Sequence, residues 1–226
     1  MPISLDRSEF FKGLTDEQFE IFLGKGRRET LQPKSILFSQ GDPVEECYLV
    51  KRGRLKLNML NEQGREVILR YISSGELTAA TAVLRDREYP GTAECVNEVE
   101  VIGWNKSTLL ELMHLYPAIA INLLGIVFDR IDEVQHRYLE VCTEHVDQRI
   151  GRTLLRLMRR AGVKIPQGIH IDIPLSRQNI ADYSGTTLYT VSRTLSYWEK
   201  KGWIESGREK IIIKDAHALV LFSEGS

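Results

Sequence analysis

One long apolar stripe constrains this chain more than any other feature of its sequence. Residues 117–146 are predicted to form one helix, for which Pro117 suits the first turn. Along it, seven residues recur at alternating intervals of three and four: Leu124, Val127, Ile131, Val134, Tyr138, Val141 and His145. This spacing is the a/d seam of a two-stranded coiled coil, so the first six are predicted dimer-interface residues. The alternative is an ordinary core helix within one chain, although a stripe this narrow is unusual there.

Charge is divided unevenly along the chain. The 226 residues suffice for two modest domains and carry a net charge of -1. Residues 147–214 hold 13 Lys/Arg and 6 Asp/Glu, whereas the remainder holds 17 Lys/Arg and 25 Asp/Glu. The basic part is therefore the predicted binder of a polyanion, with a solvated basic face that has no partner as the alternative.

Targeting and cysteine patterns favour a cytoplasmic protein. The longest apolar run is broken by Asn122 and Asp129 and falls short of the roughly 20 residues that a bilayer demands. The first residues lack the basic start and apolar run of a signal peptide. Cys47, Cys95 and Cys142 lie far apart without a CxxC pair, so neither a disulfide framework nor a common metal site is expected.

The amino-terminal half is predicted to be a barrel or sandwich of short strands. Thr15 and Gln18 have the spacing of a capping box that opens a short helix. Glycine-containing turns then separate segments of alternating polarity at 35–38, 47–50, 54–60, 66–72, 92–96 and 98–104. Residues 105–116 return to helical spacing and lead into the long helix.

The carboxy-terminal part carries the signals of a winged helix-turn-helix. Ser176 is a predicted cap for a first helix, Gly185 suits a tight turn, and Thr187 is a predicted cap for a second helix. Two closely crossing helices also need small and apolar residues at set intervals, here Ala181, Gly185, Val191 and Leu195. Residues 203–215 are predicted to form a hairpin that turns near Gly207. A plain helical pair would not explain the exposed polar cluster at the start of the second helix.

In these features the chain resembles the Crp/Fnr family, the bacterial transcription regulators that include the cyclic-AMP receptor protein and the fumarate-nitrate regulator. The resemblance covers almost the whole chain. It implies an α+β fold: an N-terminal cyclic-nucleotide-binding-like, cupin-type β-barrel (1–116), a dimerisation helix (117–146) and a C-terminal winged helix-turn-helix (147–226). It also implies an allosterically controlled homodimer on a near-palindromic operator, with half-sites about 34 Å apart. RNA polymerase is a further expected partner if the protein is an activator.

The family's DNA-reading segment falls on residues 188–193. By the resemblance, Arg193 contacts guanine, Ser192 contributes to reading, and Arg177 and Gln178 hold backbone phosphates. Relatives often have arginine or valine and then glutamate where this chain has Leu188 and Tyr189, so the usual half-site is not assumed. The full set of expected DNA-binding residues is Arg177, Gln178, Thr187, Leu188, Tyr189, Thr190, Ser192 and Arg193.

The signals of better-known relatives do not match the barrel. The Gly-Glu and Arg-Ser pairs that bind cyclic AMP fall on Ala79 with Ala80 and on Tyr89 with Pro90. No amino-terminal cysteine cluster is present for iron and sulfur, and the Cys and His heme ligands of the carbon-monoxide sensors fall on Ala79 and Thr81. Two alternatives stay open: a nucleotide phosphate held by loop arginines Arg85 and Arg87, and heme on another histidine, namely His114, His136 or His145.

The effector itself is predicted to bind an apolar pocket against the long helix, lined by Ala79, Ala80, Thr81, Tyr89, Thr92, Phe128 and Ile131. Small residues that merely fill a corner of the barrel are the alternative. The segment 187–199 is most similar to members that answer nitric oxide or oxygen status, so a gas or redox signal is the favoured effector class.

An enzyme and a signalling adaptor are the alternative functions for such a barrel. The cupin barrel also carries metal-dependent catalysis, which needs histidines two apart on a strand together with a carboxylate. The five histidines, at 114, 136, 145, 170 and 217, include no such pair in the barrel. We therefore expect no catalytic and no metal-binding residues. The basic winged domain argues against a pure signalling adaptor.

Overall fold

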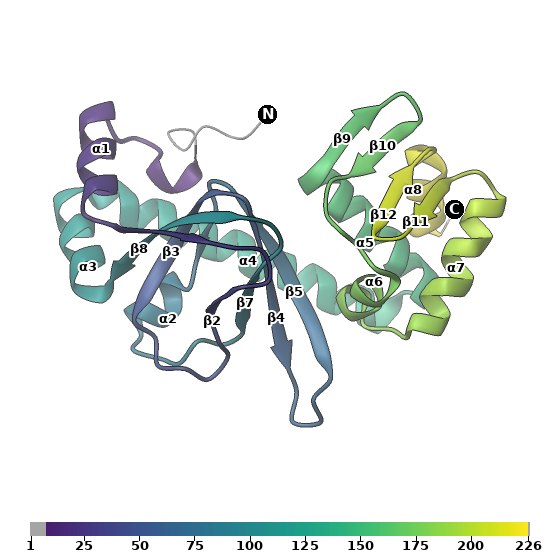
Figure 1. Ribbon diagram of the computed structural model, residues 1–226, viewed down its shortest axis with the longest axis horizontal. Helices are drawn as coiled ribbons and strands as arrows, with labels where there is room; N and C mark the ends of the chain where they lie inside the picture. The colour runs from purple at the N-terminus through teal and green to yellow at the C-terminus, as the bar shows by residue number, and fades with distance from the viewer. Residues whose placement is uncertain (1–7, 226) are drawn as a thin grey trace. The chain divides into compact units, whose positions relative to one another are not determined.

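The computed structural model describes residues 8–225 and divides by its contacts into two units, Met1–Glu133 and Val134–Ser226 (Figure 1). The boundary falls within the long helix, whereas the sequence analysis placed divisions at both ends of that helix. The first seven residues, on which the prediction about a signal peptide depends, lie outside the described part.

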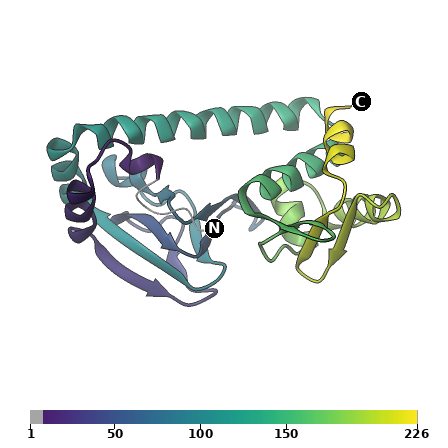
Figure 2. The same cartoon turned by 90° about the horizontal axis from the view of Figure 1, so that it is seen from above.

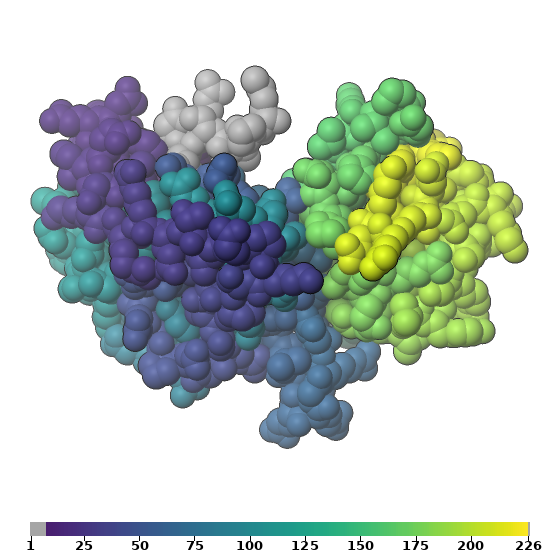
Figure 3. Space-filling view, viewed as in Figure 1, coloured from purple at the N-terminus to yellow at the C-terminus, as the bar shows by residue number. Residues whose placement is uncertain are grey.

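The first unit is built on two antiparallel four-stranded sheets, in the orders β1-β8-β3-β6 and β2-β7-β4-β5, as the predicted barrel requires. Its strands are β1 (Arg27–Leu31), β2 (Ile36–Phe38), β3 (Glu46–Arg52), β4 (Arg54–Leu60), β5 (Glu66–Ser73), β6 (Leu77–Thr78), β7 (Thr92–Cys95) and β8 (Val99–Asn105). Its short helices are η2 (Glu9–Phe11), α1 (Asp16–Gly24), α2 (Ala80–Leu84) and α3 (Lys106–Leu115). The β4–β5 hairpin protrudes from this unit (Figures 1 and 3).

The six predicted strand segments are all present, and the capping box of Thr15 and Gln18 opens α1. Strands β1 and β6 were not predicted. Strand β1 pairs with β8 at the edge of its sheet and exposes most of its side chains, so its sequence lacks the apolar alternation of a half-buried strand.

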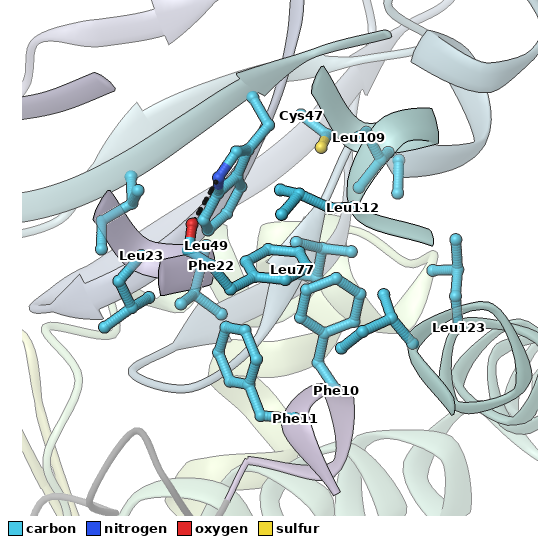
Figure 4. Close-up of a cluster of buried hydrophobic side chains, with 14 of the residues drawn as sticks. Phe10, Phe11, Phe22, Leu23, Cys47, Leu49, Leu77, Leu109, Leu112 and Leu123 are labelled. Atoms are coloured by element: carbon cyan, nitrogen blue, oxygen red, sulfur yellow. Dashed lines mark hydrogen bonds between the residues drawn. The ribbon is translucent and has the colours of Figure 1, made fainter. Parts of the chain in front are cut away.

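Aromatic and aliphatic side chains from distant segments form the core of the first unit (Figure 4). Phe10, Phe22 and Leu109 are fully buried, and the indole of Trp104 donates to the Phe22 carbonyl oxygen at 3.2 Å. A Cβ on Gly26, between α1 and β1, would lie 2.2 Å from the Ile102 side chain, so glycine permits the close approach of this connection to β8.

Helix α4 (Pro117–Thr143) runs unbroken for 27 residues (Figure 2). It ends at Thr143, three residues before its predicted end. His145 instead caps the start of the next helix, donating its backbone N–H to Gln148 Oε1 at 2.9 Å. The placement of His145 on the seam was therefore wrong. Among the described residues, no single helix is long and apolar enough to cross a membrane; α3 and α4 pass that test only as a pair bent by 115°.

One side of α4 is apolar and exposed, and we call it the α4 stripe: Ile121, Leu124, Phe128, Ile131, Val134, Tyr138 and Val141. Its exposed fractions run from 44% at Ile131 to 71% at Tyr138. Val127, predicted for the interface, is partly buried against the core of the first unit, where Ile119 and Leu123 are buried too. Phe128, which the sequence analysis assigned to the effector pocket, lies on the stripe instead.

A charged network fastens α4 to the first unit. The Glu76 carboxylate, in the turn after β5, accepts hydrogen bonds from Arg70 at 3.1 Å, from the Ser73 N–H at 2.8 Å and from Arg130 of α4. The Arg70 side chain is only 13% exposed. Because Arg70 and Arg130 share one carboxylate, Glu76 connects strand β5 with the long helix.

The second unit contains the end of α4 and the predicted winged helix-turn-helix. Its elements are α5 (Val146–Ala161), β9 (Gly162–Ile165), β10 (Gly168–Ile171), α6 (Arg177–Ser184), α7 (Leu188–Lys200), β11 (Ile204–Gly207), β12 (Lys210–Ile213) and α8 (Ala216–Glu224), with sheet order β11-β12-β10-β9. The caps are as predicted: Ser176 accepts from the Asn179 N–H at 3.0 Å, and Thr187 from the Thr190 N–H at 3.2 Å. Gly185 has a φ of +66° at the turn, a conformation that favours glycine.

Replacing Glu76 with glutamine is expected to lower the free energy of unfolding of the first unit by about 1 to 3 kcal/mol, because the largely buried Arg70 loses its charged partner. Urea denaturation followed by circular dichroism measures the change. Glu98→Gln is the matched control: Glu98 and Arg52 also pair, but their side chains are 46% and 66% exposed, so less than about 1 kcal/mol is expected. Equal losses in the two variants would contradict the assigned network.

Candidate functional site

Helix α7 has one buried and one exposed side. Val191, Leu195 and Trp198 are fully buried in the second unit. The burial of Val191 and Leu195 was predicted from their spacing. The opposite side carries the predicted reading residues: Thr187, Leu188, Tyr189 and Arg193 are exposed, and Thr190 and Ser192 are half-buried. The six therefore cluster at the exposed start of one helix, where a DNA groove could reach them.

Arg193 is the one predicted reading residue with a permanent charge on this face. Its guanidinium has no ion-pair partner among the described residues. Together with Thr190 it lines a groove of about 560 Å³, whose other side is formed by the start of α5, including His145 and Asp147. An exposed, unpaired arginine keeps all its donors for an external acceptor, and its fork geometry matches guanine O6 and N7.

The two residues predicted to hold phosphates already have partners in the protein. Arg177, the first residue of α6, donates to Ser206 Oγ of β11 at 3.3 Å, and Ser206 in turn donates to Glu199 of α7. Gln178 donates to Asp182 Oδ1 one turn along α6. The Arg177 contact was missed because it depends on how α6 and the wing pack together, whereas the Gln178 contact is a local i, i+4 pair within α6 that its spacing could have indicated.

The end of α4 is attached to the helix-turn-helix by charged side chains that sequence analysis did not anticipate. The Arg137 guanidinium lies 4.6 Å from the centre of the Tyr183 ring and donates to the Tyr183 carbonyl oxygen at 3.0 Å. Arg156 of α5 pairs with Glu140 at 2.6 Å. Arg156 is therefore half-buried against α4 rather than directed into solvent.

Tyr89, which was predicted to line the effector pocket, belongs to the core of the barrel. Tyr89 is only 4% exposed and stacks on Phe38 with ring centres 4.2 Å apart. Its hydroxyl donates to the Glu46 carbonyl oxygen at 2.9 Å and accepts the Glu46 N–H at 3.2 Å. Thr92 is similarly engaged, since its hydroxyl accepts the Gln40 N–H at 3.0 Å. Both residues stabilise the barrel, and the open groove that Tyr89 lines with Gln40 and Arg87 contains no other residue of the predicted set.

The remaining pocket residues do not converge either. Ala79 has a φ of 62° before α2, and Ala80 is buried behind it. Phe128 and Ile131 are exposed on the α4 stripe. Thr81 is the one member of the predicted set that lines a large apolar groove on the first unit, about 680 Å³ between α2, α3 and α4. Among the described residues, the seven predicted residues are therefore not brought together around one groove.

Cysteine and histidine are the side chains that could serve as ligands of a metal or heme. Burial raises the pKa of Cys47 to about 12 and that of Cys95 to about 11, so both thiols stay protonated near neutral pH. The Nδ1 atom of His114 lies 2.7 Å from the Leu110 carbonyl oxygen within α3. Within residues 8–225, no group of three or more His, Cys, Asp and Glu side chains could hold a metal ion.

Comparison with known proteins covers both units. The model of the cyclic nucleotide-binding domain matches residues 28–116, and the model of the Crp-like helix-turn-helix domain matches residues 148–222. These two stretches contain the barrel of the first unit and the reading helix of the second.

Similar proteins span nearly the full chain. The nitrogen fixation regulation protein FixK of Azorhizobium caulinodans is 27% identical over 94% of this chain and 87% of its own length. The cyclic AMP receptor protein of Thermus thermophilus is 26% identical over 94% and 95%. The solved structure of FixK2 from Bradyrhizobium japonicum has the same fold, with a TM-score of 0.75 and 22% identity over 86% of this chain and 96% of that one. The protein is thus a member of the Crp/Fnr family of transcription regulators, with a DNA-binding helix-turn-helix and no enzymatic activity.

Proposed function

We propose that the protein is a homodimeric, cytoplasmic regulator that binds a near-palindromic operator in double-stranded DNA under the control of a small-molecule effector sensed by the first unit. The observation that carries the proposal is the start of α7, where Arg193 and neighbouring side chains are exposed to solvent on the second unit, which is basic. A polyanion meets favourable charge there, and side chains of several types can read base edges.

The α4 stripe supports the homodimer. Seven apolar or aromatic side chains remain between 44% and 71% exposed along one helix, which is costly in water unless a partner covers them. A second copy of the same helix supplies a self-complementary surface under two-fold symmetry. Two-fold pairing also presents two reading helices to DNA, which matches an operator of two related half-sites.

The effector is proposed to act by population shift: it binds one arrangement of the long helices better than another and so changes how the reading helices are presented. A gas or redox signal such as nitric oxide or oxygen is the proposed class, and RNA polymerase is the proposed partner at activated promoters. The second candidate is a nucleotide or small anionic metabolite. Arg85 and Arg87 near α2 are exposed and have no ion-pair partner within residues 8–225, which favours this candidate over a neutral metabolite.

Ile131→Asp is expected to convert the dimer into a monomer, because each apolar stripe residue contributes on the order of 1.5 to 3 kcal/mol on burial and a carboxylate would be buried against its own symmetry mate. Sedimentation velocity measures the mass. Ile36→Asp is the matched control, since Ile36 on β2 is 47% exposed against 44% for Ile131. A dimeric Ile131→Asp protein would show that the stripe is not the interface.

Arg193→Ala is expected to reduce affinity for the operator much more than for scrambled DNA, since a bidentate contact to guanine carries about 1 to 3 kcal/mol of discrimination. Arg177→Ala should weaken both duplexes about equally and lower the salt slope by roughly one unit. Fluorescence anisotropy across a salt series separates the two effects. If Arg193→Ala loses affinity evenly on both duplexes, the reading residues are assigned wrongly.

Cyclic AMP is expected to leave operator affinity unchanged. At the positions of the family's binding pairs, the methyl groups of Ala79 and Ala80 offer no hydrogen bond, and the Tyr89 hydroxyl is committed to the backbone of Glu46. A buried phosphate without donors would cost several kcal/mol. Anisotropy with and without the nucleotide, beside calorimetry, provides the measurement. Micromolar binding together with tighter operator binding would refute the expectation.

A further inference from the structure

The apolar groove between α2, α3 and α4 has the dimensions of a small-molecule site. Its volume of about 680 Å³ lies within the range of roughly 300 to 1,000 Å³ typical of ligand pockets. The side chains of Leu84, Met113, Leu123 and Val127 give it an apolar lining. Leu123 is only 7% exposed, so it lies deep in the groove, while the other three are partly buried.

The rim of the groove is positively charged. Arg85 and Arg87 line it and are exposed, and neither has an ion-pair partner among the described residues. Asp86, which lies between them in sequence, pairs with Lys106 and does not line the groove. Glu88 contributes one negative charge to the rim. Two arginines and one glutamate leave a net charge of +1, which suits a ligand with a single negative group.

The groove lies beside the α4 stripe rather than on it. Of the seven stripe residues, Leu124 lines the groove, whereas Phe128 and Ile131 do not. Most of the lining comes from α2, α3 and the inner side of α4, which pairing along the stripe does not need. A partner helix can therefore cover the stripe while the groove keeps room for a ligand.

We infer that this groove binds an amphipathic monocarboxylate, with its hydrocarbon part on the apolar lining and its carboxylate on Arg85 and Arg87. Charge-assisted hydrogen bonds from arginine to a carboxylate are roughly twice as strong as neutral ones, so the rim selects an acid over an alcohol of equal length. The inference rests on the proposed function in one respect, that the bound acid acts as an effector, of the second candidate class (a small anionic metabolite) rather than a gas or redox signal. Through Leu124 and Val127 the ligand would contact the helix that carries the dimer stripe.

Calorimetry on the full-length protein, with dodecanoate as the probe and dodecan-1-ol as its neutral match, tests the inference without DNA. One dodecanoate is expected per chain, bound at least tenfold more tightly than the alcohol. Arg85→Ala combined with Arg87→Ala should remove that preference, whereas Arg28→Ala, at an exposed arginine on β1 without an ion pair among residues 8–225, should keep it. Met113→Trp, and independently Ala120→Phe from the α4 side, should abolish binding of both probes by filling the groove.

Three outcomes would overturn the inference. Equal affinity for acid and alcohol would remove the role of the arginines. Binding that survives both filling variants would place the ligand elsewhere. Binding to the monomeric Ile131→Asp variant but not to the wild type would mean that a second copy of the chain occupies the groove. None of these results depends on operator binding, so the proposal of a DNA-binding regulator would stand or fall separately.

Discussion

The burial of Ile119 and Leu123 in the core of the first unit determines which side of α4 is exposed to solvent. Each such side chain contributes on the order of 1.5 to 3 kcal/mol, so the helix cannot rotate about its axis without losing much of its attachment. With the inner side fixed, helical periodicity sends Leu124, Phe128 and Ile131 outward. The exposed stripe is therefore a consequence of how the barrel core is packed.

Charged side chains then fasten the helix to each unit. Arg130 shares the Glu76 carboxylate with Arg70 in the first unit, and Arg137 caps the carbonyl of Tyr183 in the second. Partly buried charge-assisted hydrogen bonds of this kind are directional and have few alternative geometries. A ligand that favours one position of α4 can consequently influence both units through one helix, provided that its affinity differs between the two states.

The sequence predicted those parts of the fold that depend on neighbouring residues and failed where distant contacts decide. The caps at Ser176 and Thr187 and the turn at Gly185 follow from local hydrogen bonding and backbone conformation, and all three were confirmed. Strand β1 was missed because an exposed edge strand carries no apolar alternation. Tyr89, predicted for the effector pocket, stacks on Phe38, which lies 51 positions away in the sequence, and no local pattern encodes such a contact.

The placement of tryptophan gives the chain separate optical reporters. Trp104, buried beside Phe22, is the one indole in the first unit, whereas Trp198 and Trp203 belong to the second. Unfolding of either unit would expose the tryptophans of that unit to water and change their fluorescence emission independently of the other unit. Because two units with separate cores need not unfold together, the all-or-none approximation does not hold automatically for this chain. A single melting temperature would then average two different equilibria, and single-tryptophan versions of the protein would resolve them.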